Sequence, residues 1–266
     1  MDKQQYILEI NGLSKSFGKN RVLKDISLQI RPSSIMGLMG ENGAGKSTMM
    51  KCLFGIYSMD SGSIKLDGKN IEFTGPKDSL EHGIAMVHQE LNQCLDRTIL
   101  DNMFLGRYLG PFGLVDEKSM LEKCKSIFKS LDMNFNPKTI MRTMSVSQRQ
   151  MVEIAKAVSY NSKVIVLDEP TSSLSEREVN KLFKIIKKLR DEKGISFIFI
   201  SHKMDEIFNL CDDIVILRDG QVTLDKKVKD TDLNELVSAM ECFGVENRKQ
   251  GRSLYGTKRD GSIQKK

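Results

Sequence analysis

The segment Gly40–Ser47 constrains this chain more than any other, because it matches the pattern GxxxxGK[ST] in full. Glycines let the backbone bend so that consecutive N–H groups point at phosphate oxygens, and the following helix adds the positive end of its dipole. The apolar run Ser34–Met39 precedes the segment, and a helix is predicted at Lys46–Phe54. This context is the one that a phosphate-binding loop requires, so the sequence predicts an α/β fold built around such a loop.

Each part of this loop has an expected contact with a bound nucleotide. Lys46 is expected to reach the β- and γ-phosphates, and the Ser47 hydroxyl is expected to coordinate Mg²⁺. The residues expected to hold the nucleotide are Gly40, Glu41, Asn42, Gly43, Ala44, Gly45, Lys46, Ser47 and Thr48. An incidental glycine-rich turn is the alternative, and the position between a strand and a helix argues against it.

Two acidic residues follow another predicted strand. Val164–Leu167 is a short, continuous apolar run, as expected of a strand buried on both faces, and Asp168 and Glu169 come directly after it. Ligands of α/β proteins bind at the carboxyl ends of such strands. We expect Asp168 to hold Mg²⁺ and Glu169 to polarise the water that attacks the γ-phosphate. A single acid at a strand end is often only a solvated loop residue, but two adjacent acids downstream of a phosphate loop favour catalysis.

A histidine follows a second buried strand, predicted at Ile195–Ile200. A single histidine is more often a packed or surface residue than a catalytic one. The end of this strand, however, is expected to face the same crevice as the acid pair. We therefore expect a neutral His202 imidazole to donate a hydrogen bond to the γ-phosphate and to orient the water.

The chain changes character between residue 92 and about residue 160. Hydrophobic residues recur there at helical spacing: Met120, Leu121, Cys124, Ile127, Phe128 and Leu131, then Met151, Ile154, Ala155 and Val158. This pattern predicts a helical lobe at 92–160, inserted into an α/β core at 1–91 and 161–239. No internal repeat and no second phosphate loop are present in the sequence, so residues 1–239 are predicted to form a single nucleotide-binding domain.

Turn and capping signals predict several of the remaining elements. Alternating apolar residues at 6–10 and 26–30 indicate strands with one buried face. A capping box that begins at Ser175 predicts a helix that Gly194 ends. Asp219–Gly220, between two apolar runs, predicts a tight hairpin.

The net charge of +6 is concentrated near the C-terminal end. Residues 246–266 carry +5 of it, so the rest of the chain is nearly neutral and lacks the basic footprint of a nucleic-acid-binding domain. We expect residues 240–266 to form a basic, disordered tail. The five cysteines lie far apart and include no CxxC pair, which argues against a disulfide framework or a zinc site.

The sequence also bears on the compartment. No apolar run approaches the roughly 18–20 residues that a membrane-spanning helix needs. The start, Met1–Gln5, lacks the apolar stretch of a secretory signal. We therefore expect the chain to be made and kept in the cytosol, and to meet a membrane only through a partner.

The order of these motifs resembles that of the ATP-binding subunits of ABC transporters. The phosphate loop is followed by Gln89 within Val87–Glu90, by Met144–Gln148, by the acid pair and by His202. The resemblance covers residues 5 to about 235. It implies the P-loop ATPase fold of that family, with an antiparallel β subdomain and an inserted helical lobe. It also implies that the chain binds ATP with Mg²⁺ and hydrolyses it.

The resemblance adds further roles. Gln89 resembles the loop glutamine that senses Mg²⁺, supports catalysis and joins the core to the helical lobe. Phe17 stands where the family places an aromatic residue that stacks on adenine, with a phenylalanine of the core as the alternative. Ser172–Ser175 occupies the loop that contacts the opposite domain. The family's signature, which completes the ATP site of the opposite domain, corresponds here to Ser145, Val146, Ser147 and Gln148.

Three positions depart from the family's pattern. Val146 and Ser147 stand where glycines are usual, and Ser175 replaces the usual acid of the dimer-contacting loop. Glycines let the backbone approach a phosphate closely, whereas a Cβ at both positions hinders that approach. We therefore expect this signature to be a poor partner for ATP.

Several stretches are similar to the first half of bacterial galactose/methyl galactoside import ATP-binding proteins. They are residues 38–51, 52–57, 86–91, 145–156 and 200–207. That family normally carries two ABC domains in one chain, and its second half has a weakened phosphate loop and the better signature. The resemblance implies that this chain is a truncated or half-size version whose intact loop lacks a good signature, so that ATP turnover should be slow.

The function expected from the sequence is that of an ATP-hydrolysing subunit that energises an importer of a monosaccharide, galactose or a methyl galactoside. The implied partners are membrane permease subunits, a sugar-binding protein that acts through the assembled transporter, and a second ABC domain from a twin or another chain. The implied location is the cytoplasmic face of the bacterial inner membrane. Two alternatives stay open: a truncated or half-size nucleotide-binding module with weak ATPase activity, and a soluble ABC ATPase not linked to transport.

Overall fold

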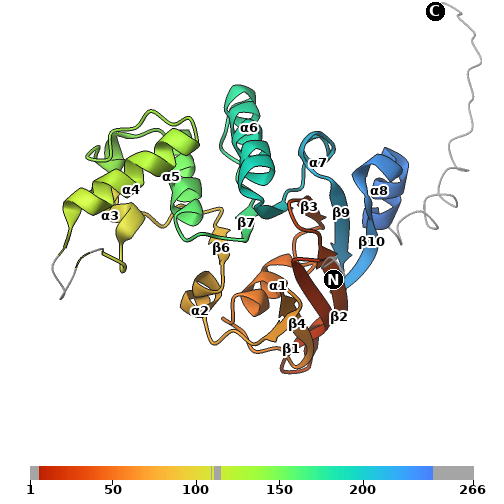
Figure 1. Cartoon of the computed structure of the whole chain (residues 1–266). Coiled ribbons are helices and arrows are strands. Elements are labelled where there is room, and N and C mark those ends of the chain that lie inside the picture. The colour runs from red at the N-terminus through yellow and green to blue at the C-terminus, as the bar shows by residue number, and fades with distance from the viewer. Residues whose placement is uncertain (1–5, 109, 111–114, 242–266) are drawn as a thin grey trace, which may run out of the picture.

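The computed structural model describes residues 6–108, 110 and 115–241, and within these ranges the strands form two sheets (Figure 1). One sheet is antiparallel, with the order β2-β1-β4-β5, and the other has the order β10-β9-β3-β8-β7-β6. The first contains β1 (Leu8–Phe17), β2 (Asn20–Ile30), β4 (Ser61–Leu66) and β5 (Lys69–Ile71). The second contains β3 (Ile35–Met39), β6 (Ile84–Val87), β7 (Val164–Asp168), β8 (Ser196–Ile200), β9 (Asp213–Arg218) and β10 (Gln221–Lys227). In the second sheet β9, β3, β8, β7 and β6 run parallel, and β10 pairs with β9 in the opposite direction.

The two sheets differ in how they are buried, as their sequences predict. In β2, the buried residues Ile26, Leu28 and Ile30 alternate with exposed ones, which is typical of a strand with one face in the core. β3 and β8 are buried along their whole length, and β7 is buried up to Leu167, because both faces of this sheet are covered.

The six-stranded sheet separates two hydrophobic clusters. Along β7, Ile165 packs into one cluster with residues of the helices α5 and α6, whereas Val166 packs into the other with residues of α1 and the antiparallel sheet. The functional elements at the strand ends therefore rest on a sheet that is held from both sides.

Eight α-helices lie in the described residues. They are α1 (Lys46–Leu53), α2 (Pro76–Glu81), α3 (Ile99–Phe104), α4 (Glu117–Ser130), α5 (Val146–Val158), α6 (Glu176–Lys193), α7 (Met204–Leu210) and α8 (Leu233–Glu241). Helices α3, α4 and α5 lie together on one side of the molecule, away from the antiparallel sheet (Figure 1). They fall within the segment 92–160, between β6 and β7 in the chain. None of the helices in the described residues is both long and apolar enough to cross a membrane.

The capping and turn predictions are confirmed. Helix α6 begins after Ser175, whose capping box includes Glu178, and ends at Gly194, which has a left-handed backbone with φ 67°. The hairpin between β9 and β10 turns at Asp219 and Gly220, with φ 49° and 75°. These local signals worked because each turn needs a backbone conformation that few residues adopt.

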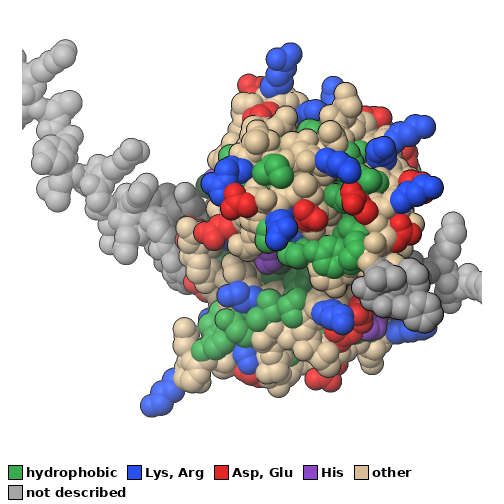
Figure 2. Space-filling view, turned by 90° about the vertical axis from the view of Figure 1, so that its left-hand side faces the viewer, with side chains coloured by type: hydrophobic (Ala, Val, Ile, Leu, Met, Phe, Trp, Pro, Cys, Tyr) green, Lys and Arg blue, Asp and Glu red, His purple; other side chains and the backbone are tan. Residues whose placement is uncertain are grey.

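At the C-terminal end, α8 continues through Glu241, so Met240 and Glu241 belong to this helix. The rest of the tail predicted at 240–266 lies outside the described residues. The face of the molecule in Figure 2 carries basic and acidic side chains intermixed, with hydrophobic side chains around a hollow. On this face the charges form no patch of one sign.

Candidate nucleotide-binding site

Four neighbouring strand ends bring most of the expected site residues to one edge of the six-stranded sheet. The phosphate loop follows β3, His202 comes two residues after β8, Asp168 ends β7, and Gln89 comes two residues after β6. These strands are consecutive in the order β3-β8-β7-β6 and run parallel. Their carboxyl ends therefore meet at the same edge, where ligands of α/β proteins bind.

The phosphate loop has a backbone that requires glycine at two positions. Gly40 has φ 154°, and a Cβ there would lie 2.2 Å from the carbonyl oxygen of Leu217. Gly45 has φ 107°, and a Cβ there would lie 2.7 Å from a methyl carbon of Leu23. The loop is thus fixed between β9 and β2, and its shape depends on the absence of these side chains.

Lys46 lies across its own loop. Its Nζ donates to the carbonyl oxygens of Gly40 at 2.6 Å and Glu41 at 3.0 Å. Burial lowers the Lys46 pKa, while the carboxylates of Glu169 and Asp168 act in the opposite direction. A phosphate arriving at the loop would offer the ammonium group a stronger, charge-assisted partner than these two carbonyls.

Asp168 lies in a place that suits a cation. Burial raises the Asp168 pKa, and the nearby Glu169 carboxylate raises it further. A divalent cation would relieve this crowding of negative charge. In the described residues no group of three or more His, Cys, Asp or Glu is placed to hold a metal. The donor set of Ser47, Gln89 and Asp168 nevertheless fits Mg²⁺, which binds proteins through one or two carboxylates and takes its other ligands from phosphates and water.

Glu169 lies between the other two predicted catalytic residues. Gln89 Nε2 donates to Glu169 Oε2 at 3.2 Å, and His202 Nδ1 lies 3.4 Å from Glu169 Oε1. The Glu169 side chain is 20% exposed, whereas that of His202 is 60% exposed. Each oxygen of the Glu169 carboxylate therefore has a polar side chain beside it. Gln89 lies at one oxygen, and the exposed imidazole of His202 lies at the other. This arrangement suits the activation of a water molecule.

The backbone of Glu169 is strained. Its φ of 44° lies in the left-handed region, which is uncommon for a residue with a side chain. Its N–H donates to the carbonyl oxygen of Ile200 at 3.0 Å, which links the end of β7 to the end of β8. Strain of this kind, of about 1–3 kcal/mol, persists only where the surrounding structure enforces it.

Phe17 ends β1 and is 44% exposed. Its ring meets the Tyr57 ring edge to face, with centroids 5.1 Å apart, and Lys15 Nζ lies 5.5 Å from its centroid. Among the described residues, no hydrogen bond, ion pair or ring contact joins Phe17 to residues 40–48. The structure therefore leaves its contact with adenine as a prediction.

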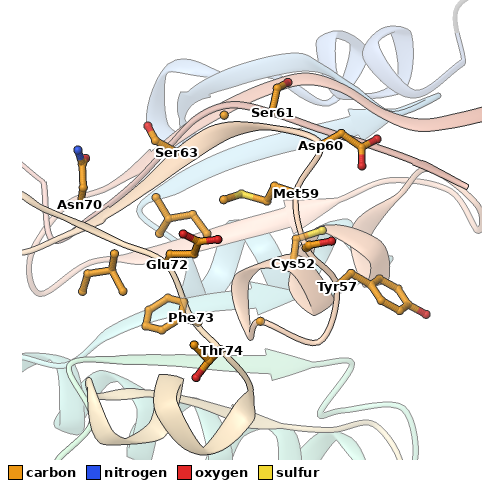
Figure 3. Close-up of a pocket in the computed structure, with 15 residues that line it drawn as sticks. Cys52, Tyr57, Met59, Asp60, Ser61, Ser63, Asn70, Glu72, Phe73 and Thr74 are labelled. Carbon is orange, nitrogen blue, oxygen red and sulfur yellow. The ribbon is translucent and has the colours of Figure 1, made fainter.

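Tyr57 was not predicted as a site residue, because its pairing with Phe17 joins distant parts of the chain. It stands at the rim of a cavity of about 630 Å³, and Figure 3 shows its ring turned away from that cavity. On the same rim, Asp60 accepts hydrogen bonds from Lys15 and from the Ser16 N–H. The cavity is thus bordered by residues that also position the end of β1.

The signature segment begins helix α5. Ser145 caps the helix: its Oγ accepts from the Gln148 N–H at 3.2 Å, and its N–H donates to Gln148 Oε1 at 3.0 Å. Ser147 Oγ lies 3.0 Å from Ser145 Oγ. A hydrogen bond from the Ser147 side chain is the largest cause that lowers the Glu178 pKa to about 2. Val146 is 39% exposed.

The structure does not bring this segment to the phosphate loop of the same chain. Across residues 6–108, 110 and 115–241, no hydrogen bond or ion pair joins Ser145–Gln148 to Gly40–Thr48. Instead, the polar groups of the segment bond to one another and to Glu178 at the start of α6. The signature and the loop are therefore separate surfaces of this chain.

Comparison with known proteins places the fold and the motifs in a family. The family model described as ABC transporter matches residues 23–172, which is more than half of the chain. The chain belongs to the ABC transporter family. Two structures at 25% identity have the same fold and confirm the predicted fold class. A nucleotide-free ATP-binding cassette from an ABC transporter gives a TM-score of 0.78 over 87% of this chain and 97% of that one. The second, cbiO1 from Clostridium perfringens, gives a TM-score of 0.77 over 88% and 94%.

Within the ABC transporter family, the predicted resemblance to sugar-import proteins is confirmed. The chain is 68% identical to the galactose/methyl galactoside import ATP-binding protein MglA of Treponema denticola, over 91% of this chain and 48% of that protein. It is 52% identical to the protein of the same name from Salmonella typhimurium, over 89% and 46%. The chain thus spans about half the length of the curated relatives it matches.

Proposed function

We propose that this chain binds ATP with Mg²⁺ and hydrolyses it to energise a membrane importer of a monosaccharide. The meeting of Gln89, Glu169 and His202 at the strand ends beside the phosphate loop carries this proposal. The proposed cargo is galactose or a methyl galactoside, because relatives with 68% and 52% identity are named for the import of these sugars.

In the proposed site, the loop residues Gly40–Thr48 hold the phosphates. Their N–H groups and the start of α1 face the anion, and Lys46 exchanges its two carbonyl partners for phosphate oxygens. Mg²⁺, held by Ser47, Gln89 and Asp168, would neutralise phosphate charge when it is bound. Phe17 is proposed to stack on the adenine.

Glu169 and His202 act on the attacking water in this proposal. Glu169 accepts the hydrogen bond of the water and polarises it, and Gln89 holds the second oxygen of the carboxylate. His202, with an open ring at 3.4 Å from Glu169, donates to the γ-phosphate. The positions of these atoms at a shared edge of the sheet support each proposed role.

The proposed ATP site is completed by a second ABC domain, supplied by a twin chain or another protein. Ser145, Val146, Ser147 and Gln148 would face the loop of that second domain. Permease subunits would receive the motion through the helical lobe and the Gln89 segment, and a sugar-binding protein would act through the assembled transporter. The complex would lie at the cytoplasmic face of the bacterial inner membrane.

A cavity of about 200 Å³ supports this placement of the permease. It lies between β6 and α5, next to the Gln89 segment, and is lined by Met86, His88, Glu90, Glu153 and Tyr160 among others. A permease segment seated there would touch both the sheet edge and the helical lobe. Movement of one against the other would then reach the partner.

A second candidate function is a nucleotide-binding module with weak turnover. One observation favours it: Ser147, where the family has glycine, bonds within its own chain to Ser145 and Glu178. A phosphate from the opposite domain would have to compete with these partners. This candidate shares the ATP-binding step with the first and differs in the rate of hydrolysis.

The test is ATP binding and hydrolysis by the full chain, with Lys46→Ala as the variant. Equilibrium dialysis with Mg²⁺ and ATP should show binding that the variant loses. Absence of binding by the unaltered chain would contradict the proposal. The transport part is tested in vesicles that contain a matching permease, where uptake of labelled galactose should require both ATP and the intact Lys46. ATP binding without such uptake would favour the second candidate.

A further inference from the structure

A buried carboxylate lies directly behind the proposed catalytic pair. Glu206 is in the first turn of α7, and its side chain is only 8% exposed. Removing a carboxylate from water is costly unless hydrogen bonds and an opposite charge compensate for it. Such a group in this place therefore needs an explanation beyond the packing of α7.

The hydrogen bonds of Glu206 join two segments that are distant in the chain. Oε2 accepts from Thr171 Oγ1 and from Ser201 Oγ, both at 2.8 Å. Oε1 pairs with Lys203 Nζ at 3.1 Å. One carboxylate oxygen thus holds a residue that follows β7 and a residue that follows β8, and both hydrogen bonds are buried.

These two segments carry the two residues that meet in the proposed site. Thr171 lies two positions after Glu169, and Ser201 lies directly before His202. Glu169 Oε1 and His202 Nδ1 are 3.4 Å apart, although the His202 ring is mostly exposed. The contact therefore depends on the backbones of the two segments rather than on packing around the imidazole.

The strained backbone of Glu169 is a second observation that supports a positioning role for the segments after β7 and β8. Its left-handed conformation, φ 44°, needs the following residues to be held in place. The Glu169 N–H bond to Ile200 secures the residue on its N-terminal side, and the Thr171 bond to Glu206 secures the chain beyond it.

We propose that Glu206 is the positioning residue that sets the separation of Glu169 and His202, by holding the segments after β7 and β8 on one carboxylate oxygen. This inference rests on the proposed roles of Glu169 and His202 in ATP hydrolysis. A different explanation is that Glu206 only stabilises α7, since an acid in the first turn also complements the helix dipole. The two explanations differ in whether Glu206 affects the catalytic pair.

The first experiment compares Glu206→Gln with Glu206→Ala in the full chain. The amide oxygen of Gln can still accept both hydroxyl hydrogen bonds, whereas Ala leaves Thr171 and Ser201 without them. We expect Glu206→Ala to lower ATP turnover about 10- to 100-fold, the range expected when a catalytic group is displaced by about 1 Å. ATP affinity should change less than about twofold, because the phosphate loop is untouched, and Glu206→Gln should restore most of the turnover.

Ser196→Ala is the matched control for loss of a buried hydrogen bond. Ser196 is fully buried at the opposite end of β8, and its hydroxyl donates to the carbonyl oxygen of Arg31 at 3.1 Å. The Ser196→Ala variant should turn over ATP at nearly the rate of the unaltered chain, at a temperature where all variants are folded. Equal losses of turnover in Ser196→Ala and Glu206→Ala would overturn the proposal, as would a Gln variant no better than the Ala variant.

The second experiment detects the contact between Glu169 and His202 by NMR and does not depend on ATP turnover. The chain has three histidines, so the imidazole NMR signals of His202 can be assigned by comparison with His202→Ala. At a fixed pH, Glu169→Gln should shift these signals in the unaltered and Glu206→Gln backgrounds, but not in the Glu206→Ala background. An equal shift in all three backgrounds would overturn the positioning role. Failure of the unaltered chain to bind ATP would overturn the proposed function, while this NMR comparison would still decide the inference.

Discussion

The phosphate loop and the signature segment are two surfaces of one chain that differ in how they can receive a phosphate. The loop has glycine wherever a side chain would collide, and its lysine is held by two carbonyl oxygens that a phosphate can replace. The signature has Cβ atoms at Val146 and Ser147, and the polar groups of Ser145 and Ser147 already bond within the chain. The loop of this chain is thus well suited to bind a phosphate, whereas its signature segment is less suited to complete the ATP site of a second domain.

The largest effect should come from Gly40→Ala. A Cβ at Gly40 would lie 2.2 Å from the Leu217 carbonyl oxygen, a backbone atom that cannot move away easily. We expect loss of ATP binding and a decrease of about 2–4 kcal/mol in the free energy of unfolding, measured by denaturant titration and equilibrium dialysis. Gly43→Ala is the control. Gly43 has φ 88°, but a Cβ there would meet no atom within 4 Å, so this variant should lose only about 1–2 kcal/mol of the free energy of unfolding. Equal losses in both would show that the close approach at Gly40 does not matter.

The next effect separates binding from chemistry. Glu169→Gln keeps the size of the side chain and removes the charge that we propose polarises the attacking water. We expect turnover to fall about 100-fold or more, with ATP affinity nearly unchanged, because Lys46 and the loop are intact. Steady-state hydrolysis and equilibrium dialysis on the same preparation measure both quantities. A parallel loss of affinity would place Glu169 in nucleotide binding instead.

A smaller effect tests the signature itself. Replacing both Val146 and Ser147 with Gly removes the two Cβ atoms and releases Glu178, so turnover at high protein concentration should rise, by about tenfold or less. Ser147→Ala is the informative companion, because it removes the hydroxyl but keeps the Cβ. A rise of the same size in Ser147→Ala would assign the weakness to the hydrogen bonds of the Ser147 hydroxyl with Ser145 and Glu178. No rise in either variant would contradict the comparison of the two surfaces.

The smallest effect concerns stability and pH. Burial and Glu169 raise the Asp168 pKa, so the fold disfavours the charged form. The stability that comes from the protonated form is present at low pH and is lost as the pH rises through that pKa. Asp168→Asn should therefore raise Tm by a few degrees at neutral pH, and this gain should fade as the pH falls toward the Asp168 pKa.

The control for this prediction has the opposite sign. A hydrogen bond from Lys15 lowers the Asp60 pKa, so Asp60 contributes stability that is present at neutral pH and lost in acid. Asp60→Asn should lower Tm at neutral pH, as measured by the same thermal scans. If Asp168→Asn also lowered Tm, Asp168 would be shown to stabilise the fold instead of being kept for the binding of a cation.

The sequence predicted the parts of the site that rest on local patterns. Gly40–Ser47 and the acids at the end of β7 could be found because a glycine-rich turn and a buried apolar run have direct signatures in the sequence. Helix α6 was predicted with its start and end because Ser175 and Gly194 need particular backbone conformations.

The remaining parts depend on contacts between distant residues. Glu206 looks like an ordinary acid of a short helix, and its bond to Thr171 crosses 35 positions of the chain. The pairing of Phe17 with Tyr57 and the bond from Ser147 to Glu178 are of the same kind. A periodicity or motif in one segment of the chain does not indicate which distant segment will lie next to it in the fold. Only the folded structure therefore reveals these contacts.

ATP binding and ATP turnover should be measured in one sample of the full chain over a range of protein concentrations. The intact loop and the altered signature predict binding that Lys46→Ala abolishes, together with slow hydrolysis at every concentration as long as this chain is the only source of a signature. Fast hydrolysis that rises cooperatively with protein concentration would contradict the difference between the two surfaces, because it would show that Ser145–Gln148 completes an efficient ATP site.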